Sequence, residues 1–223
     1  MANPDSLVER LSKLDSCAVS DALDKLGLSG CVTGIVPLSS TRKIAGRVHT
    51  VKLVAKDKAP KPSGPPRHLG CTAIEAASPG DLIVVEQRSG IDCGSWGGIL
   101  SLGAKMRGVA GVIADGPVRD VDEAREMDFP VFGRSATART ARGRIAEQAT
   151  DVPVAIGEVT VQPGDYAIAD ASAVVFIAAS EIERVLESAE TIAARERAMA
   201  QALREGRPIG EVMGANYEHM LRS

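Results

Sequence analysis

An arginine and an aspartate follow an apolar segment near the middle of the 223-residue chain. Residues 108–113, GVAGVI, are typical of a strand that is covered on both faces, and they lead through Asp115 to Arg119 and Asp120. An aspartate oxygen suits a hard, magnesium-like ion, and the planar donor fork of arginine suits a carboxylate, carbonyl or enolate oxygen. Because ligands of layered α/β folds bind just beyond the carboxyl ends of strands, we predict a site here.

A glycine-rich segment precedes this strand and predicts the other half of the site. Gly94, Gly97 and Gly98 permit unusual backbone conformations, and a helix is expected directly after them, over residues 98–107. The free amides of its first turn, near Gly98, Ile99 and Leu100, would attract an anion. A helix start and a strand end that are joined in this way lie on the same rim of a sheet.

Together these groups would suit a 2-oxo acid. The amides that follow Gly97 would hold its carboxylate, while a metal on Asp120 and the guanidinium of Arg119 would polarise the keto oxygen. Cleavage of the C–C bond beyond the keto group leaves an enolate, which the same cations would stabilise. The alternative is a structural turn, since Asp-Gly is a common turn pair and Arg-Asp neighbours often form a solvated surface pair.

The remaining patterns predict an α/β fold in a single domain over residues 1–223. Two helices are expected within residues 4–27, the second capped by Ser16 or Ser20 and ended by Gly27. The Pro- and Lys-rich segment 56–68 is expected to be a mobile loop. A short helix is expected over 69–77, and strands are expected at 44–55, 78–86 after a Pro-Gly-Asp turn, 130–133, 152–156 and in EVTV, YAIA and AVVFIA.

The C-terminal tail, residues 180–223, is predicted to begin with a long helix. Ser180 and Glu183 have the spacing of a capping box, and apolar residues then recur at helical spacing. Glu196 falls on that apolar stripe, where a carboxylate is costly unless it is paired or hydrated. We therefore expect the stripe to pack on a neighbouring subunit.

The composition excludes several classes of function. Aromatic residues make up 3% of the chain and the net charge is −3, which disfavours a nucleic-acid partner. The four cysteines have no CxxC spacing, so a structural zinc site is not expected. Without a long apolar run or a signal-peptide pattern, a cytoplasmic protein with no membrane contact is expected.

The segments WGGILSLGAKMRGVAGVIADGPVRDVDE and FPVF, within residues 94–133, resemble the RraA-like family. This family includes the 4-hydroxy-4-methyl-2-oxoglutarate / 4-carboxy-4-hydroxy-2-oxoadipate aldolases, which are class II pyruvate aldolases. AVSDALDKLG, PGDLIVV, QPGDYAIAD and ERAMAQALREG extend the resemblance over roughly residues 15–210. It implies a compact β/β/α sandwich, homotrimers that can stack into hexamers, and a divalent metal such as Mg²⁺ or Mn²⁺.

The resemblance also implies residue roles. Catalytic members cleave 4-hydroxy-2-oxo acids to pyruvate and often decarboxylate oxaloacetate. By similarity, the amides of Ile99 and Leu100 and the side chain of Arg119 would hold pyruvate, Asp120 would hold the metal, and Glu196 would reach the site from a neighbouring subunit. Members that lack the Arg-Asp pair regulate a ribonuclease by binding it, and this chain has both residues.

Three positions depart from the family pattern. Gly98 stands where the family pattern has an acid that supports a metal-bound water. The loss of this acid is expected to affect metal affinity or proton transfer. His68 replaces an asparagine and Gly143 replaces a lysine, and both positions touch the distal part of the substrate. Arg142 or Arg144 could substitute for that lysine, and His68 is the histidine we expect to contact substrate.

Overall fold

The structure is a computed structural model, and it describes residues 6–59 and 67–214. Within these residues, one nine-stranded sheet has the order β1-β11-β10-β3-β4-β5-β6-β2, with β7 paired to β3. Its centre is parallel and consists of β3 (Ile44–Ala55), β4 (Leu82–Gln87), β5 (Gly111–Val118) and β6 (Val131–Ala136). The outer strands are antiparallel: β1 (Cys31–Val32), β2 (Val36–Pro37), β7 (Ile145–Thr150), β10 (Tyr166–Ala169) and β11 (Val174–Ile177).

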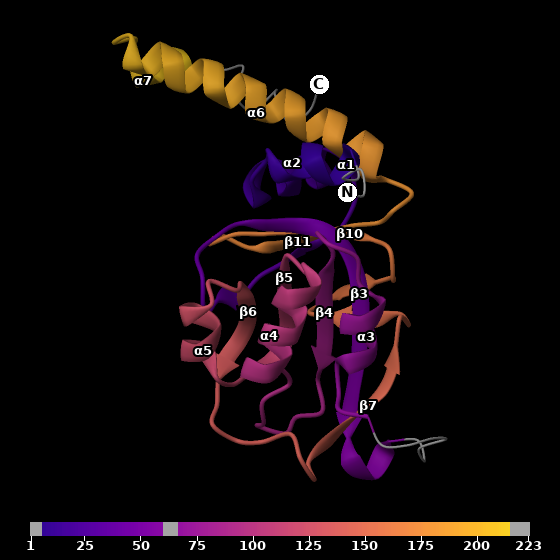
Figure 1. The fold of residues 1–223 in the computed structure, drawn as a ribbon. Coiled ribbons are helices and arrows are strands. Elements are labelled where there is room, and N and C mark those ends of the chain that lie inside the picture. The colour runs from indigo at the N-terminus through magenta and orange to yellow at the C-terminus, as the bar shows by residue number, and fades with distance from the viewer. Residues whose placement is uncertain (1–5, 60–66, 215–223) are drawn as a thin grey trace.

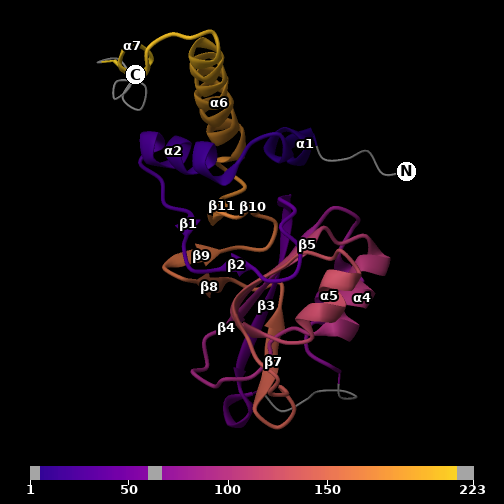
Figure 2. The ribbon, with the colours of Figure 1, turned by 90° about the vertical axis from the view of Figure 1, so that its left-hand side faces the viewer.

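The two faces of the parallel strands are covered by different elements. Three helices, α3 (Cys71–Ala76), α4 (Gly98–Arg107) and α5 (Val121–Glu126), lie on one face (Figure 1). The hairpin of β8 (Val154–Ile156) and β9 (Val159–Val161) lies on the other (Figure 2). Neighbouring strand residues therefore enter different cores, which explains why these strands are continuously apolar in sequence.

A third core joins the two ends of the chain. Here α1 (Ser6–Ser12), α2 (Ser16–Leu26) and the first half of α6 (Ile182–Arg204) pack on β10 and β11. The buried residues of α6 end at Ala193, and the rest of the helix extends away from the sheet to α7 (Ile209–Val212) (Figure 1). None of the helices in the described part of the chain is long and apolar enough to cross a membrane.

The predicted α/β class and the long C-terminal helix are confirmed. Gly27 ends α2 in a left-handed conformation, with φ of 66°. The predicted loop over 56–68 begins with the short 3-10 helix η1 (Lys56–Lys58), and its residues 60–66 lie outside the described residues, as do 1–5 and 215–223.

Three details of the predictions are wrong. The cap of α2 is Asp15, whose side chain accepts a hydrogen bond from the Ala18 amide at 2.8 Å, rather than Ser16 or Ser20. The capping box of α6 does not form, because Ser180 lies in a turn and Glu181, one residue later, begins the helix without a side-chain cap. The strand predicted over residues 108–113 begins later and extends further, since β5 is Gly111–Val118.

His49 of β3 connects two turns at the edge of the sheet. Its Nδ1 lies 3.0 Å from Asp151 Oδ1, and its Nε2 lies 3.3 Å from Asp81 Oδ2. The hydrogen bond to Asp81, assisted by Asp151, raises the pKa of His49 against the opposing effect of burial. The two carboxylates therefore favour the imidazolium form of His49 in the folded protein.

We predict that His49→Gln loses more stability near pH 6 than near pH 9. A histidine with a raised folded-state pKa stabilises fully below its unfolded pKa of about 6.5, and that contribution is lost as the pH rises through the folded pKa. Urea unfolding of the variant and the wild type at both pH values measures the difference. The exposed His68, changed to Gln, is the control. An equal loss at both pH values would contradict the prediction.

Candidate active site

The end of β5 and the start of α4 meet as the sequence predicts. Gly97 is the extended residue before α4, and it provides no side-chain cap for the helix. The backbone of the glycine segment is bonded to the strand end: the Ser95 amide donates to Pro117 O at 2.8 Å, and the Arg119 amide donates to Trp96 O at 2.9 Å. The predicted helix start and the Arg119–Asp120 pair are therefore neighbours in space.

Asp120 connects these elements through its side chain. Its Oδ2 accepts a hydrogen bond from the Gly98 amide at 3.1 Å, and Arg119 Nε lies 3.1 Å from both carboxylate oxygens. Asp120 has a left-handed backbone, with φ of 55° and ψ of 39°, at the residue before α5, yet its side chain does not cap that helix. The carboxylate is thus directed across to α4, and left-handed backbone at a non-glycine residue is often found at functional sites.

The glycines before α4 leave space for these side chains. A Cβ at Gly94 would lie 2.7 Å from Arg119 Cγ, and a Cβ at Gly97 would lie 2.8 Å from Asp120 Oδ2. A larger residue at either position would displace the Arg-Asp pair. Close approach of backbone and functional groups is the reason for glycine here, since Gly94 and Gly97 do not need a positive φ.

Glu123 is a further acid at this site, and the sequence patterns did not predict it there. The space beside Gly98 is filled by Glu123, whose Oε2 lies 1.8 Å from the position that a Cβ on Gly98 would occupy. Cβ of Asp120 lies 3.2 Å from the same point, so both acids lie against one glycine. The available signal was the spacing, because Glu123 is one helical turn after Asp120 and Gly98 lacks the acid that the resemblance implies.

Two carboxylates fit a magnesium-like ion. Mg²⁺ is commonly held by one or two carboxylates and keeps several of its waters, so it does not need a larger protein cage. Within residues 6–59 and 67–214, no group of three or more His, Cys, Asp and Glu side chains could hold a metal. A metal at this site would therefore depend on Asp120, on Glu123 and on oxygens from water or substrate.

The first-turn amides of α4 are not equivalent. The Gly98 amide is already bonded to Asp120, whereas the Ile99 and Leu100 amides have no hydrogen-bond partner among the described residues. Ile99 is 80% exposed, so the helix start opens to solvent. An anion at the predicted site would therefore bind the Ile99 and Leu100 amides, because the Gly98 amide is taken by Asp120.

The residues expected to contact the distal part of a substrate lie around this rim. His68 is exposed, with Nδ1 3.0 Å from Leu69 O, near the start of α3, which packs on α4. The loop of Arg142 and Gly143 is tied to the glycine segment, because the Gly94 amide donates to Arg139 O at 2.9 Å. Among the described residues, none of these side chains forms a hydrogen bond or ion pair with Arg119 or Asp120, so their roles stay predictions.

Glu196 is not brought to this site within one chain. It lies on α6, which packs on α1 and α2 and is separated from α4 and α5 in both views (Figures 1 and 2). Partial burial raises the pKa of Glu196, and the nearby Asp15 and Asp21 raise it further. Burial and the neighbouring Asp24 and Asp15 also raise the pKa of Asp21. The predicted role of Glu196 therefore depends on a second subunit.

Similarity to known proteins places this arrangement in a family. Residues 16–176 match the family model described as "RraA-like: Aldolase/RraA". A Halalkalibacterium halodurans protein named "Putative 4-hydroxy-4-methyl-2-oxoglutarate aldolase" is 31% identical over 202 residues, which cover 88% of each chain. Protein DlpA of Legionella pneumophila is 29% identical over 201 residues, and the matched region covers 90% of this chain but only 32% of DlpA.

Solved structures have the same fold. An uncharacterized protein from Pseudomonas syringae pv. tomato has a TM-score of 0.83 with 27% identity, over 94% of this chain and 97% of its own. Streptomyces coelicolor RraAS2, described as an unusual member of the RNase ES inhibitor RraA protein family, has a TM-score of 0.75 with 26% identity, over 93% and 100% of the two chains. By its sequence and its fold, the chain belongs to the RraA-like family.

Proposed function

We propose that this protein is a divalent-metal-dependent lyase that cleaves 4-hydroxy-2-oxo dicarboxylic acids to pyruvate and decarboxylates oxaloacetate. The observation that carries the proposal is the meeting of the Arg119–Asp120 pair with the start of α4. The names of several aldolase relatives agree with it. Both reactions break the C3–C4 bond, one carbon removed from the 2-oxo carbon, and leave the same pyruvate enolate, so one site can serve both.

The backbone amides and the guanidinium would bind different parts of the substrate. The amides of Ile99 and Leu100 bind the carboxylate of the 2-oxo acid at the helix start. The Nη groups of Arg119, which have no hydrogen-bond partner among the described residues, donate to the keto oxygen and stabilise its charge as the enolate forms. The Nε of the same guanidinium remains on Asp120 and fixes its orientation.

Asp120 and Glu123 would hold Mg²⁺ or Mn²⁺ beside Gly98. When bound, the metal would act as a Lewis acid toward the keto oxygen. In this assignment the carboxylate of Glu123 takes the role of the acid that the family pattern has at position 98. Glu123 lies at the start of α5, which keeps its carboxylate close to Asp120. Glu196 of another subunit would serve as the acid or base that moves the proton of the 4-hydroxyl group.

A regulatory binding protein is the alternative, and the similarity to RraAS2 supports it. The two candidates differ in what they require of the site. A protein that acts by binding an enzyme surface does not need a carboxylate and a guanidinium at a helix start. The presence of both Arg119 and Asp120 therefore favours the lyase.

For the proposed lyase, we first predict that Asp120→Asn abolishes metal-dependent turnover. The amide keeps the size of the side chain but removes the negative charge that attracts a hard dication, so the rate of pyruvate formation from oxaloacetate should fall at least about 100-fold. A coupled pyruvate assay with Mg²⁺ or Mn²⁺, with EDTA as the control, measures it. Full activity in EDTA, or in the variant, would rule out the metal mechanism.

A second prediction concerns Glu123. In Gly98→Ala the new methyl group takes the space of the Glu123 carboxylate, which can swing away because it is the end of a flexible side chain. Metal affinity should therefore fall about 10-fold or more, with little change in melting temperature. Titration followed by Trp96 fluorescence or calorimetry measures the affinity. Gly103→Ala in the same helix is the control, since a Cβ there meets nothing within 4 Å. Equal metal affinities in Gly98→Ala and Gly103→Ala would show that Glu123 does not bind the metal.

The third prediction concerns assembly. We propose a homotrimer, or a dimer of trimers, in which the tail carries Glu196 to a neighbour; the exposed Leu203, Ile209 and Met213 of that tail fit such packing. Mixing inactive Asp120→Asn chains with inactive Glu196→Gln chains should then restore part of the activity, because some interfaces carry both intact residues. Glu187→Gln, on an exposed position of α6, is the control for Glu196→Gln. A monodisperse active monomer in light scattering would contradict this assembly.

A further inference from the structure

β5 contains a bulge immediately before the candidate active site. Ala114 lies opposite Gly133 of β6, but the next pairing is Pro117 with Ser135. Two residues of β5, Asp115 and Gly116, therefore lie opposite the single residue Arg134. Bulges bend a strand and redirect the side chains that follow, and they occur often beside active sites. Here the bulge is four residues before Arg119.

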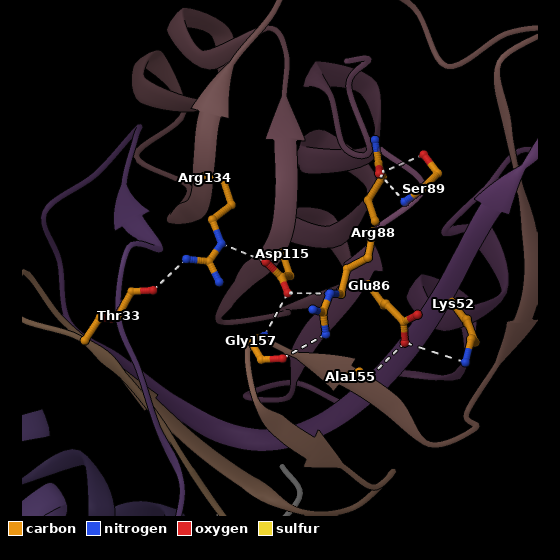
Figure 3. A network of polar contacts seen from close by, with 10 residues as sticks. Thr33, Lys52, Glu86, Arg88, Ser89, Asp115, Arg134, Ala155 and Gly157 are labelled. Carbon is orange, nitrogen blue, oxygen red and sulfur yellow. Dashed lines mark hydrogen bonds and ion pairs between the residues drawn. The ribbon is translucent and has the colours of Figure 1, made fainter. Parts of the chain in front are cut away.

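An ion pair between a buried carboxylate and a partly exposed arginine spans the bulge. Asp115 Oδ1 lies 2.7 Å from Arg134 Nε, and the Asp115 side chain is only 7% exposed (Figure 3). Its Oδ2 accepts a hydrogen bond from the Gly157 amide at 2.8 Å, and Arg88 Nε lies 3.9 Å away. Arg134 continues the connection, because its Nη1 donates to Thr33 O at 2.6 Å. The carboxylate thus ties the bulge to β6, to the β8–β9 hairpin and to the segment before β2.

The position of the bulge is transmitted directly to the site. Just after it, Pro117 O accepts hydrogen bonds from both the amide and the hydroxyl of Ser95, each at 2.8 Å. Two residues later, the Arg119 amide bonds to Trp96 O. The strand end therefore sets the place of the glycine segment as well as that of Arg119. A change in the bulge would therefore displace residues of both halves of the site.

Anchoring of the hairpin does not account for Asp115 by itself, because a neighbouring carboxylate already does this. Glu86 of β4 is paired in register with Asp115, and its Oε2 accepts a hydrogen bond from the Ala155 amide at 2.7 Å, with Lys52 Nζ at 3.7 Å (Figure 3). Glu86 is also nearly buried, but it lies in a regular stretch of the strand. The two acids share the hairpin and differ in that only Asp115 holds the bulge.

We propose that Asp115 is a positioning residue, whose ion pair with Arg134 fixes the bulge that places Arg119 and Asp120 against the start of α4. The catalytic part of this inference rests on the proposed lyase function. The structural part does not, because it concerns the order of residues 94–100 and 117–120 in the protein as it stands.

The test compares Asp115→Asn with Glu86→Gln, since both remove a carboxylate that anchors the hairpin. We expect faster amide hydrogen exchange over residues 94–100 and a shifted Trp96 emission in Asp115→Asn, with neither change in Glu86→Gln. Trp96 is the single tryptophan of the chain. With oxaloacetate, kcat should fall at least about 10-fold in Asp115→Asn and stay within about 2-fold of wild type in Glu86→Gln, at comparable melting temperatures.

Arg134→Lys is a second variant that keeps the charge and loses the planar fork, so it covers the case in which Asp115→Asn does not fold. It should cause the same changes to a smaller extent. If the wild type shows no turnover, the proposed function fails, and the exchange and emission data alone decide the positioning role. Unchanged exchange over residues 94–100 in both Asp115→Asn and Arg134→Lys would overturn the inference, as would equal changes in Glu86→Gln.

Discussion

The carboxylate of Asp120 joins the strand and the helix on which the candidate active site depends. It accepts a hydrogen bond from the first residue of α4 and lies against the guanidinium of Arg119, its neighbour in sequence. A non-glycine residue in the left-handed region has a conformational cost of about 1–2 kcal/mol, which the surrounding contacts must offset. This backbone conformation turns the side chain of Asp120 away from α5 and toward α4.

The meeting of these groups could be predicted because it follows from chain topology. A helix between two neighbouring parallel strands begins at the edge where both strands end, so the start of α4 and the end of β5 must be close. The apolar run before Arg119 and the glycines before α4 give this order without any knowledge of side-chain contacts. The sequence could thus locate Gly97–Leu100 and Arg119–Asp120 on one rim.

The features that the sequence did not predict correctly depend on side-chain geometry or on pairing between strands. Glu123 looks like an ordinary exposed acid of a helix, and only the space beside Gly98 shows its proximity to Asp120. The bulge at Asp115 and Gly116 could not be located from the sequence, because it is defined by the register with β6 and an Asp-Gly pair also suits a simple turn. The capping box at Ser180 has the correct spacing, but the turn after β11 places Glu181 at the helix start instead. Local patterns cannot decide such competition between alternatives.

The acidic residues of α2 and α6 give a physical reason to expect association with a second subunit, in addition to the burial of apolar residues. Glu196 and Asp21 both have raised pKa values, so each carboxylate is held at a cost in the isolated subunit by burial and by like charge. A cationic neighbour would lower that cost, and on the proposed assignment this neighbour is the metal site of another subunit. Metal binding and subunit association would then stabilise each other, because a free-energy coupling between two binding events is reciprocal. The tail would in this way make an occupied site and a complete assembly mutually dependent.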